Sequence, residues 1–314
     1  MADHTRGRVP SWLALTGAAL VGIMTATQAR VNGALGVTLD DAFVAAFISF
    51  ASGLVLVAVV STVLPVGRRG ARMLVDGVRG RRIPWWMLVG GAAGALTVAT
   101  QGLVVGLIGV SLFTVGLVAG QTVAGLVLDR LGFGPGGAVA VTMPRVLGGL
   151  LALVAAALPL TGDVLGEIPL WMLVLPLLAG MGVAWQQGTN GRLRQRVGTP
   201  LTATLVNFIG GTTVLGVAAL VHGVFAGPPR PLPADVWLYL GGALGATYIF
   251  LSAALVAHTG VLLLGLGTIA GQLLASIVLD VLWPASASPP LGLALVIIAV
   301  ALAAVAVAGA PWRR

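Results

Sequence analysis

The residues able to do chemistry in this sequence are mostly side-chain amides within apolar stretches. Gln28 and Asn32 are four positions apart and would share one face of a helix, and Gln186 and Asn190 repeat that spacing. An amide donates and accepts hydrogen bonds without carrying charge, so amides facing one cavity would suit a polar, uncharged or zwitterionic ligand. We therefore predict a substrate-binding site made of Gln28, Asn32, Trp185, Gln186, Gln187, Asn190 and Tyr248.

The two Asn-Gly pairs, Asn32-Gly33 and Asn190-Gly191, have a second interpretation. Glycine after the last helical residue readily adopts the left-handed conformation that closes many helices. On this alternative the asparagines are helix C-caps, and the glutamines alone face a cavity.

A second repeated pattern combines small residues with an amide. Glycines four positions apart let helix backbones approach closely, and a neighbouring amide can hydrogen-bond across the contact. We favour helix packing over ligand binding for this pattern, and we expect it to hold the helices that carry it in close contact with each other. Its members are Gly116, Gly120 and Gln121 in the first half, and Gly267, Gly271 and Gln272 in the second.

Catalytic and metal-binding constellations are not apparent. The chain has no cysteine and no lysine, and its three histidines lie far apart, which argues against a thiolate metal site, a Schiff base or a P-loop. Asp129 and Asp280 are the only acids that repeat; their place at predicted helix ends is ordinary, and a proton or ion role is the alternative. We predict no catalytic residue, no metal and no cofactor, and hence no enzyme.

The elements that must position these residues are apolar helices. Of 314 residues 58% are hydrophobic and 8% charged, against about 25% charged in a soluble domain. The mean hydropathy is +1.05, and apolar stretches near the length of a membrane-spanning helix recur throughout. We predict an all-α polytopic membrane protein with spans at about 11–31, 42–64, 84–106, 109–129, 138–160, 170–189, 200–222, 235–257, 260–282 and 291–310.

The net charge of +8 reports orientation. With the N-terminus inside, the inner segments carry fifteen arginines and three acids (+12), whereas the outer segments carry two arginines and six acids (−4). This split follows the positive-inside rule, so we expect both termini and the basic loop from Arg68 to Arg82 to be cytoplasmic. We expect the loop to touch lipid headgroups, and we expect no nucleic-acid partner.

The chain also repeats itself. A shift of 158 positions superimposes Gln28 on Gln186, Asn32 on Asn190 and Phe50 on Phe208. A shift of 151 superimposes Gly120-Gln121 on Gly271-Gln272. The first span therefore matches the sixth, so it is not a cleaved signal peptide.

Each repeat holds five spans, an odd number, so the second copy must be inverted in the membrane. Inverted repeats suit alternating access, because two similar packings of opposite facing can exchange around a central site. The expected organisation is a cytoplasmic tail (1–10), a first repeat (11–160), an external connection (161–169), an inverted second repeat (170–310) and a second tail (311–314).

The pattern G-x5-Q-x3-N-G at 22–33, its echo at 180–191 and the paired five-helix organisation resemble the drug/metabolite transporter superfamily, most closely its YdcZ-like branch. The resemblance implies a secondary carrier of a small metabolite or drug-like solute in the bacterial inner membrane. It names no substrate, and the first span lacks the glutamate with which the superfamily's small multidrug exporters bind protons and cations. We expect a small-molecule substrate, the lipid bilayer as surroundings, and a monomer or homodimer; the alternative function is a membrane scaffold or accessory protein.

Overall fold

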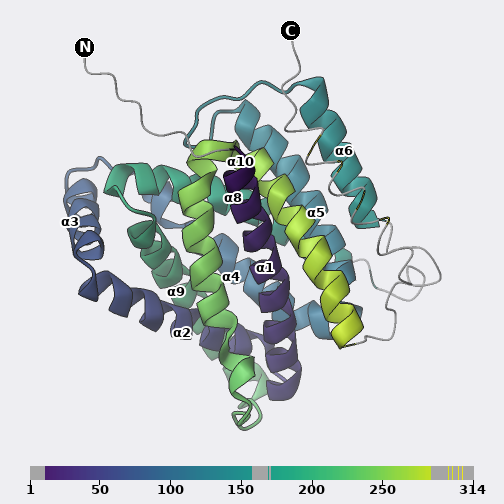
Figure 1. The fold of residues 1–314 in the computed structure, drawn as a ribbon. Coiled ribbons are helices and arrows are strands. Elements are labelled where there is room, and N and C mark those ends of the chain that lie inside the picture. The colour runs from purple at the N-terminus through teal and green to yellow at the C-terminus, as the bar shows by residue number, and fades with distance from the viewer. Residues whose placement is uncertain are drawn as a thin grey trace, which may run out of the picture.

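A computed structural model describes residues 11–157 and 171–283, together with Pro169 and single positions 296, 299, 303 and 306. All regular structure in these residues is helical (Figure 1). The predicted connection at 161–169 and most of the predicted tenth span lie outside the described residues. The helices are α1 (Ser11–Leu39), α2 (Ala42–Val63), α3 (Pro65–Arg79), η1 (Trp85–Leu88), α4 (Gly90–Thr100), η2 (Gln101–Val105), α5 (Gly106–Arg130), α6 (Met143–Ala157), α8 (Trp171–Val197), α9 (Pro200–Ala226), η4 (Val236–Tyr239) and α10 (Gly241–Leu282).

Five helices among the described residues are long and apolar enough to cross a membrane. Each of the first nine predicted spans is helical within the described part of the chain, so the prediction of an all-α polytopic membrane protein is confirmed. The five long apolar helices are Trp12–Leu39, Ala42–Val63, Trp85–Ile108, Pro200–Ala226 and Val236–Val261, and Leu263–Leu279 is a shorter one.

Matching helix starts show the repeat in local structure. The Asp41 carboxylate accepts hydrogen bonds from the backbone N–H groups of Phe43 and Val44 and so caps α2. At the equivalent position of the second half, the Thr199 hydroxyl accepts from the N–H of Leu201 and caps α9. Side-chain oxygens at these positions satisfy N–H groups that the first helical turn leaves free.

The eighth and ninth predicted spans lie mostly within α10, which consists of two helical parts joined at a break at Gly260. Gly260 has φ 73°, a conformation that glycine adopts without a steric penalty. The N–H of Val261, which opens the second part of α10, donates a 2.9 Å hydrogen bond to the Asp129 carboxylate of α5. Asp129 is thus a buried cap on a helix of the other half.

The C-cap interpretation of the Asn-Gly pairs is wrong. α1 continues to Leu39 and α8 to Val197, each several residues beyond its Asn-Gly pair. The glycines instead admit neighbours, because a methyl group on Gly33 would lie 2.9 Å from the Val105 side chain. Both helices therefore continue past a residue pair that often ends a helix, and other helices pack against the glycines.

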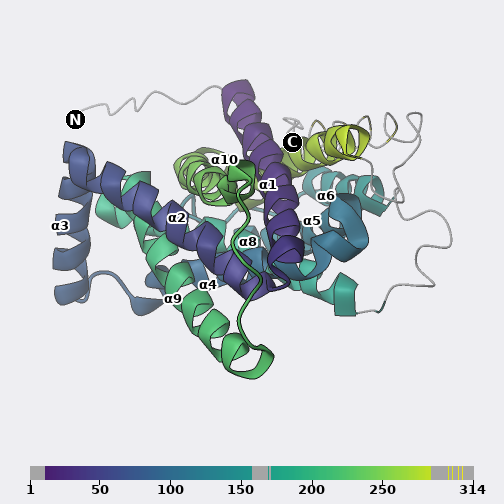
Figure 2. The same cartoon turned by 90° about the horizontal axis from the view of Figure 1, so that it is seen from below.

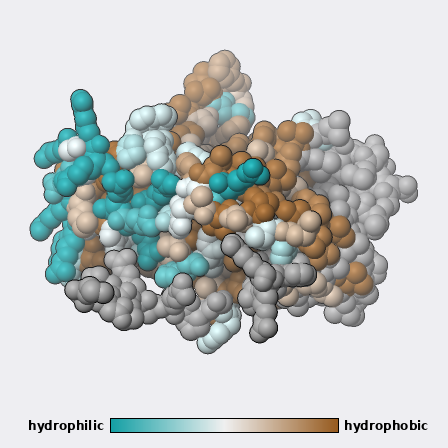
Figure 3. Space-filling view, turned by 90° about the horizontal axis from the view of Figure 1, so that it is seen from above, coloured by the Kyte–Doolittle hydropathy of each residue, from teal (hydrophilic) through white to brown (hydrophobic). Residues whose placement is uncertain are grey.

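The expectation of a basic loop from Arg68 to Arg82 is also wrong over most of that segment, because it forms α3. Its buried residues Gly67, Gly70 and Gly77 lie three or seven positions apart on one face, and its arginines lie on the other. A methyl group on Gly70 would collide with Thr199 and Thr202, so glycine allows α3 to lie directly on α9. Hydrophilic residues gather on the α3 side of the molecule in Figure 3.

The two halves pack reciprocally against each other (Figures 1 and 2). α1 of the first half lies along α10 of the second, and α8 of the second half lies along α4 and α5 of the first. α2 packs on its own repeat partner, α9. This exchange of equivalent contacts agrees with the predicted inverted repeat.

Candidate substrate site

Two phenylalanines lie at the centre of the contact between the halves. The rings of Phe50 and Phe208 are 4.9 Å apart between centroids, and both side chains are buried. Each ring lies where a side chain on a glycine of the other half would collide with it, Phe208 against Gly53 and Phe50 against Gly211. The phenylalanine pair therefore lies between two equivalent environments.

The first amide cluster joins α1 to the start of α10. Nε2 of Gln28 donates a 2.8 Å hydrogen bond to the carbonyl oxygen of Gly241. Nδ2 of Asn32 donates a 2.7 Å bond to Oε1 of Gln101 in η2. A methyl group on Gly241 or Gly245 would collide with these amides, so the glycines create the space that the amides fill.

The second amide cluster joins α8 to α9 and α4. Gln186 and Asn190 both donate to Oδ1 of Asn207, over 2.8 Å and 3.1 Å. Gly90 and Gly94 of α4 lie against Asn190 and Gln186, as Gly241 and Gly245 lie against the first cluster. Equivalent residues therefore occupy equivalent seams between the halves.

Both clusters hold hydrogen-bonding atoms that have no partner among the described residues. A buried polar atom without a partner costs about 1–3 kcal/mol, so a ligand that supplied the partner would be favoured. Donors and acceptors are both present, which suits a ligand carrying both. The atoms are Oε1 of Gln28, Oδ1 of Asn32, Nε2 of Gln101 and Oγ of Ser49 in the first cluster, and Oε1 of Gln187, Nδ2 of Asn207 and Oγ of Ser252 around the second.

The cavity at the second cluster is nearly closed in this structure. It measures about 10 Å³, close to the least that one water molecule requires. It does not include Gln28, Asn32 or the half-buried Trp185, so the amides form two seams rather than the single shared cavity that we expected. The lining residues are Val183, Gln186, Gln187, Asn190, Tyr248, Ile249 and Ser252.

The predicted substrate-binding set omits Gln101, Asn207, Ser49 and Ser252, although Gln101 and Asn207 are polar candidates within the predicted spans. Under the two shifts, Asn207 corresponds to Ser49 and Gln101 to Ser252, so an amide in one half is a serine in the other. The repeat therefore did not single these positions out. Their signal was only that they are polar residues within apolar spans.

The repeated glycine pattern lies at close helix contacts. A methyl group on Gly120 of α5 would collide with the carbonyl oxygen of Leu177 in α8, and one on Gly271 of α10 would collide with that of Ala19 in α1. The expectation that these glycines join the two helices that carry them is thus wrong, because each faces the first helix of the opposite half. Gly116, Gln121 and Gln272 are buried, and a methyl group on Gly267 would lie 2.6 Å from Cβ of Ala18.

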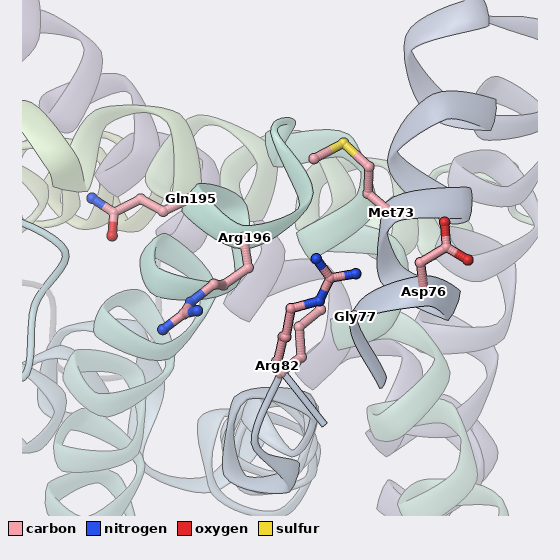
Figure 4. Close-up of a pocket in the computed structure, with 7 residues that line it drawn as sticks. Met73, Asp76, Gly77, Arg82, Gln195 and Arg196 are labelled. Carbon is pink, nitrogen blue, oxygen red and sulfur yellow. The ribbon is translucent and has the colours of Figure 1, made fainter. Parts of the chain in front are cut away.

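A different cavity, of about 320 Å³, lies between α3 and the end of α8. Figure 4 shows Arg82 extending between Met73 of α3 and Arg196 of α8. None of its lining residues belongs to either amide cluster, and its charged lining contrasts with theirs. The lining residues are Met73, Asp76, Gly77, Arg82, Ile83, Gln195 and Arg196.

Comparison with known proteins agrees with this architecture. The sequence matches the family described as "Putative inner membrane exporter, YdcZ" over residues 13–158 and again over 171–308. The chain belongs to this family. It is accordingly a multi-pass inner-membrane protein of a transporter family, and the two matched segments correspond to the two repeats.

No curated protein matches the sequence. A crystal structure described only as that of a protein is 20% identical, with a TM-score of 0.60 over 96% of this chain and 97% of the other. At this identity the likeness shows the fold alone.

Proposed function

We propose that this YdcZ-family protein is a secondary transporter that moves a small solute across the inner membrane by alternating access. The observation that carries the proposal is the reciprocal packing of the halves, in which α1 with α10 repeats α8 with α4 and α5. Two near-equivalent packings can exchange when one half rocks against the other.

The two amide clusters support a substrate class. Every unpartnered buried atom named there belongs to an amide or a hydroxyl. Such groups pair with uncharged donors and acceptors, whereas a fully charged ligand would lose hydration without meeting an opposite charge. The substrate proposed is a small solute without net charge that carries hydrogen-bonding groups.

A thermal-shift screen of the purified protein against pools of small metabolites tests the substrate class. We expect stabilisation by uncharged or zwitterionic compounds, because a ligand that binds only the folded state raises the melting temperature. Stabilisation confined to strongly charged compounds would contradict the class.

The chain contains no cysteine, so spin labels attach only to cysteines introduced for the purpose, and alternating access can be tested with pairs of them. Spin-label pairs at Val63 with Leu205 and at Val44 with Val221 report on the two ends of the α2–α9 contact, because Leu64 lies with the start of α9 and Asp41 with His222. A compound found in the screen should change the two distances in opposite directions. Fixed distances would favour the alternative function, a scaffold or accessory protein.

A further inference from the structure

An apolar groove opens on the side of the bundle between α2, α9 and α10. It measures about 490 Å³, within the ~300–1,000 Å³ range of small-molecule sites. Its lining contains no charged residue. It is lined by Leu56, Val57, Val60, Leu64, Val66, Thr199, Pro200, Leu201, Thr204, Ala246, Thr247 and Phe250.

The three threonines do not make the groove polar. The hydroxyl of Thr204 donates to the carbonyl oxygen of Pro200, and that of Thr247 donates to Ala243. The Thr199 hydroxyl accepts the N–H of Leu201. Because each hydroxyl is occupied by its own helix, the groove offers a ligand mainly apolar contact.

The groove extends from the lateral surface of the helix bundle towards the amide clusters. Leu56, Leu64 and Phe250 are 43%, 42% and 38% exposed at its mouth. Its floor includes Val57, Leu201 and Ala246, which belong to the same packed core as Phe50 and Phe208. On α10, Thr247 lines the groove and the next residue, Tyr248, lines the cavity at the second amide cluster.

The equivalent place in the inverted repeat is closed. Under the shift of 158, Thr199, Leu201 and Leu64 of the groove correspond to Asp41, Phe43 and His222. There, Nδ1 of His222 lies 3.2 Å from Oδ2 of Asp41, and the rings of His222 and Phe43 are 5.1 Å apart between centroids. The two halves thus differ at matching positions, with space at one end of the α2–α9 pair and direct contact at the other.

We infer that the groove is a lateral entrance through which the protein takes up its solute from the bilayer, and that the Asp41–His222 pair closes the corresponding entrance at the other end. The solute class is an uncharged molecule with an apolar body and a few hydrogen-bonding groups. The apolar body fits the groove, and the hydrogen-bonding groups fit the amides behind it. This inference rests on the proposed transport function and narrows its substrate.

Benzophenone tests the entrance, because it is apolar and uncharged, carries one carbonyl acceptor and forms covalent adducts on illumination. In proteoliposomes, adducts should map to the groove residues of α2, α9 and α10. Thr247→Trp should lower labelling by about fivefold or more, because an indole would occupy much of a groove of this size. Thr213→Trp is the matched control, since Thr213 is also exposed and bonded to its own helix but does not line the groove, and its labelling should be unchanged.

A second pair of variants introduces the residues of the closed end of the α2–α9 pair at the open end, where the groove lies. Leu64→His combined with Thr199→Asp places the Asp41–His222 pair at the groove, and labelling should fall as it does with Thr247→Trp. Thr199→Asp alone keeps an N-cap residue without supplying the histidine, so its labelling should remain. The entrance would be rejected if neither Thr247→Trp nor the Leu64→His, Thr199→Asp combination lowered labelling. It would also be rejected if native mass spectra showed a tightly held phospholipid that benzophenone does not displace.

The spin-label distances separate this failure from failure of the function. Opposite distance changes together with groove-independent labelling would reject the entrance and leave the transporter. Groove-dependent labelling with fixed distances would reject the transporter, and with it the groove's role as an entrance.

Discussion

Phe50 and Phe208 occupy equivalent positions of the two repeats, and their rings contact each other 4.9 Å apart between centroids. Two equivalent residues can meet only where the axis that relates the halves passes between them. This contact therefore marks the centre of the molecule, and each amide cluster lies to one side of it.

Phe50→Ala and Phe208→Ala should destabilise the protein to a similar extent. Each removes a fully buried ring from the same contact, and such changes typically cost about 3–5 kcal/mol. Chemical unfolding in detergent gives the comparison, with Phe225→Ala as control because Phe225 is 85% exposed. A large effect at one central position and a small effect at the other would argue against the symmetric contact.

The glycine contacts predict which substitutions the helices tolerate. Gly120→Ala and Gly271→Ala should each reduce the amount of folded protein, because their methyl groups would collide with backbone atoms of α8 and α1. Gly265→Ala, on the same helix as Gly271, meets no atom within 4 Å and should be neutral or slightly stabilising. Size-exclusion yield and melting temperature measure both effects; equal behaviour of Gly265 and Gly271 variants would remove the packing argument.

Two polar side-chain contacts at the same end of α2 should differ in importance. The Asp41–His222 pair includes a buried carboxylate, whereas Arg230 and Asp40 form an exposed pair at 3.0 Å, of a kind that contributes about 0–1 kcal/mol. His222→Ala should lengthen the distance between labels at Val44 and Val221, and Arg230→Ala should leave it unchanged. The reverse pattern would assign closure of this end to the loop that carries Arg230.

Asp129 is expected to act as a helix cap rather than as a proton carrier. Asp129→Ala should lower the unfolding free energy by about 0.5–2 kcal/mol, because the N–H of Val261 would lose its partner beside the break at Gly260. Asp129→Asn retains an acceptor and should keep most of the stability. Asp76→Ala is the surface control, since Asp76 is exposed. Full stability in Asp129→Ala, with loss of transport in both Asp129 variants, would instead indicate a role in coupling.

The fold could be predicted because each step depends on local patterns. Apolar length gives the spans, and rare residues such as asparagine make the repeat visible when Asn32 pairs with Asn190. The odd number of spans in each repeat then requires inversion. The N-cap of α9 was also predictable, because Thr199 precedes Pro200 and bonds to its own helix. For α2 we expected the helix to start at Asp40, whereas the capping residue is its neighbour Asp41.

Features that depend on a partner could not be predicted in the same way. Nothing near Gly33 in the sequence says that Val105 packs there and that α1 continues to Leu39. Gly120 marks a close contact, but the pattern does not say that the opposing helix is α8. The sequence did not predict α3, because its buried face consists of three glycines, which give no apolar signal, and the rest of the segment is rich in arginine.

The last prediction concerns the two glutamines. Gln28 donates to the Gly241 carbonyl and Gln186 to Asn207, so each already links two helices. Each also belongs to a cluster with unpartnered atoms, including Oε1 of Gln28. Loss of one ligand hydrogen bond of about 0.5–1.5 kcal/mol should weaken substrate binding by roughly twofold to tenfold, and more where a ligand group is left unpaired.

Gln28→Ala and Gln186→Ala should therefore weaken the affinity for a compound found in the screen and lower the melting temperature only slightly. Gln195→Ala is the control, because Gln195 is exposed and donates to the Pro135 carbonyl away from both clusters. Titration calorimetry and thermal unfolding on the same preparations separate the two roles. Unchanged affinity with a marked loss of stability would make these glutamines interhelical links, since an amide that serves only as a link affects stability before affinity.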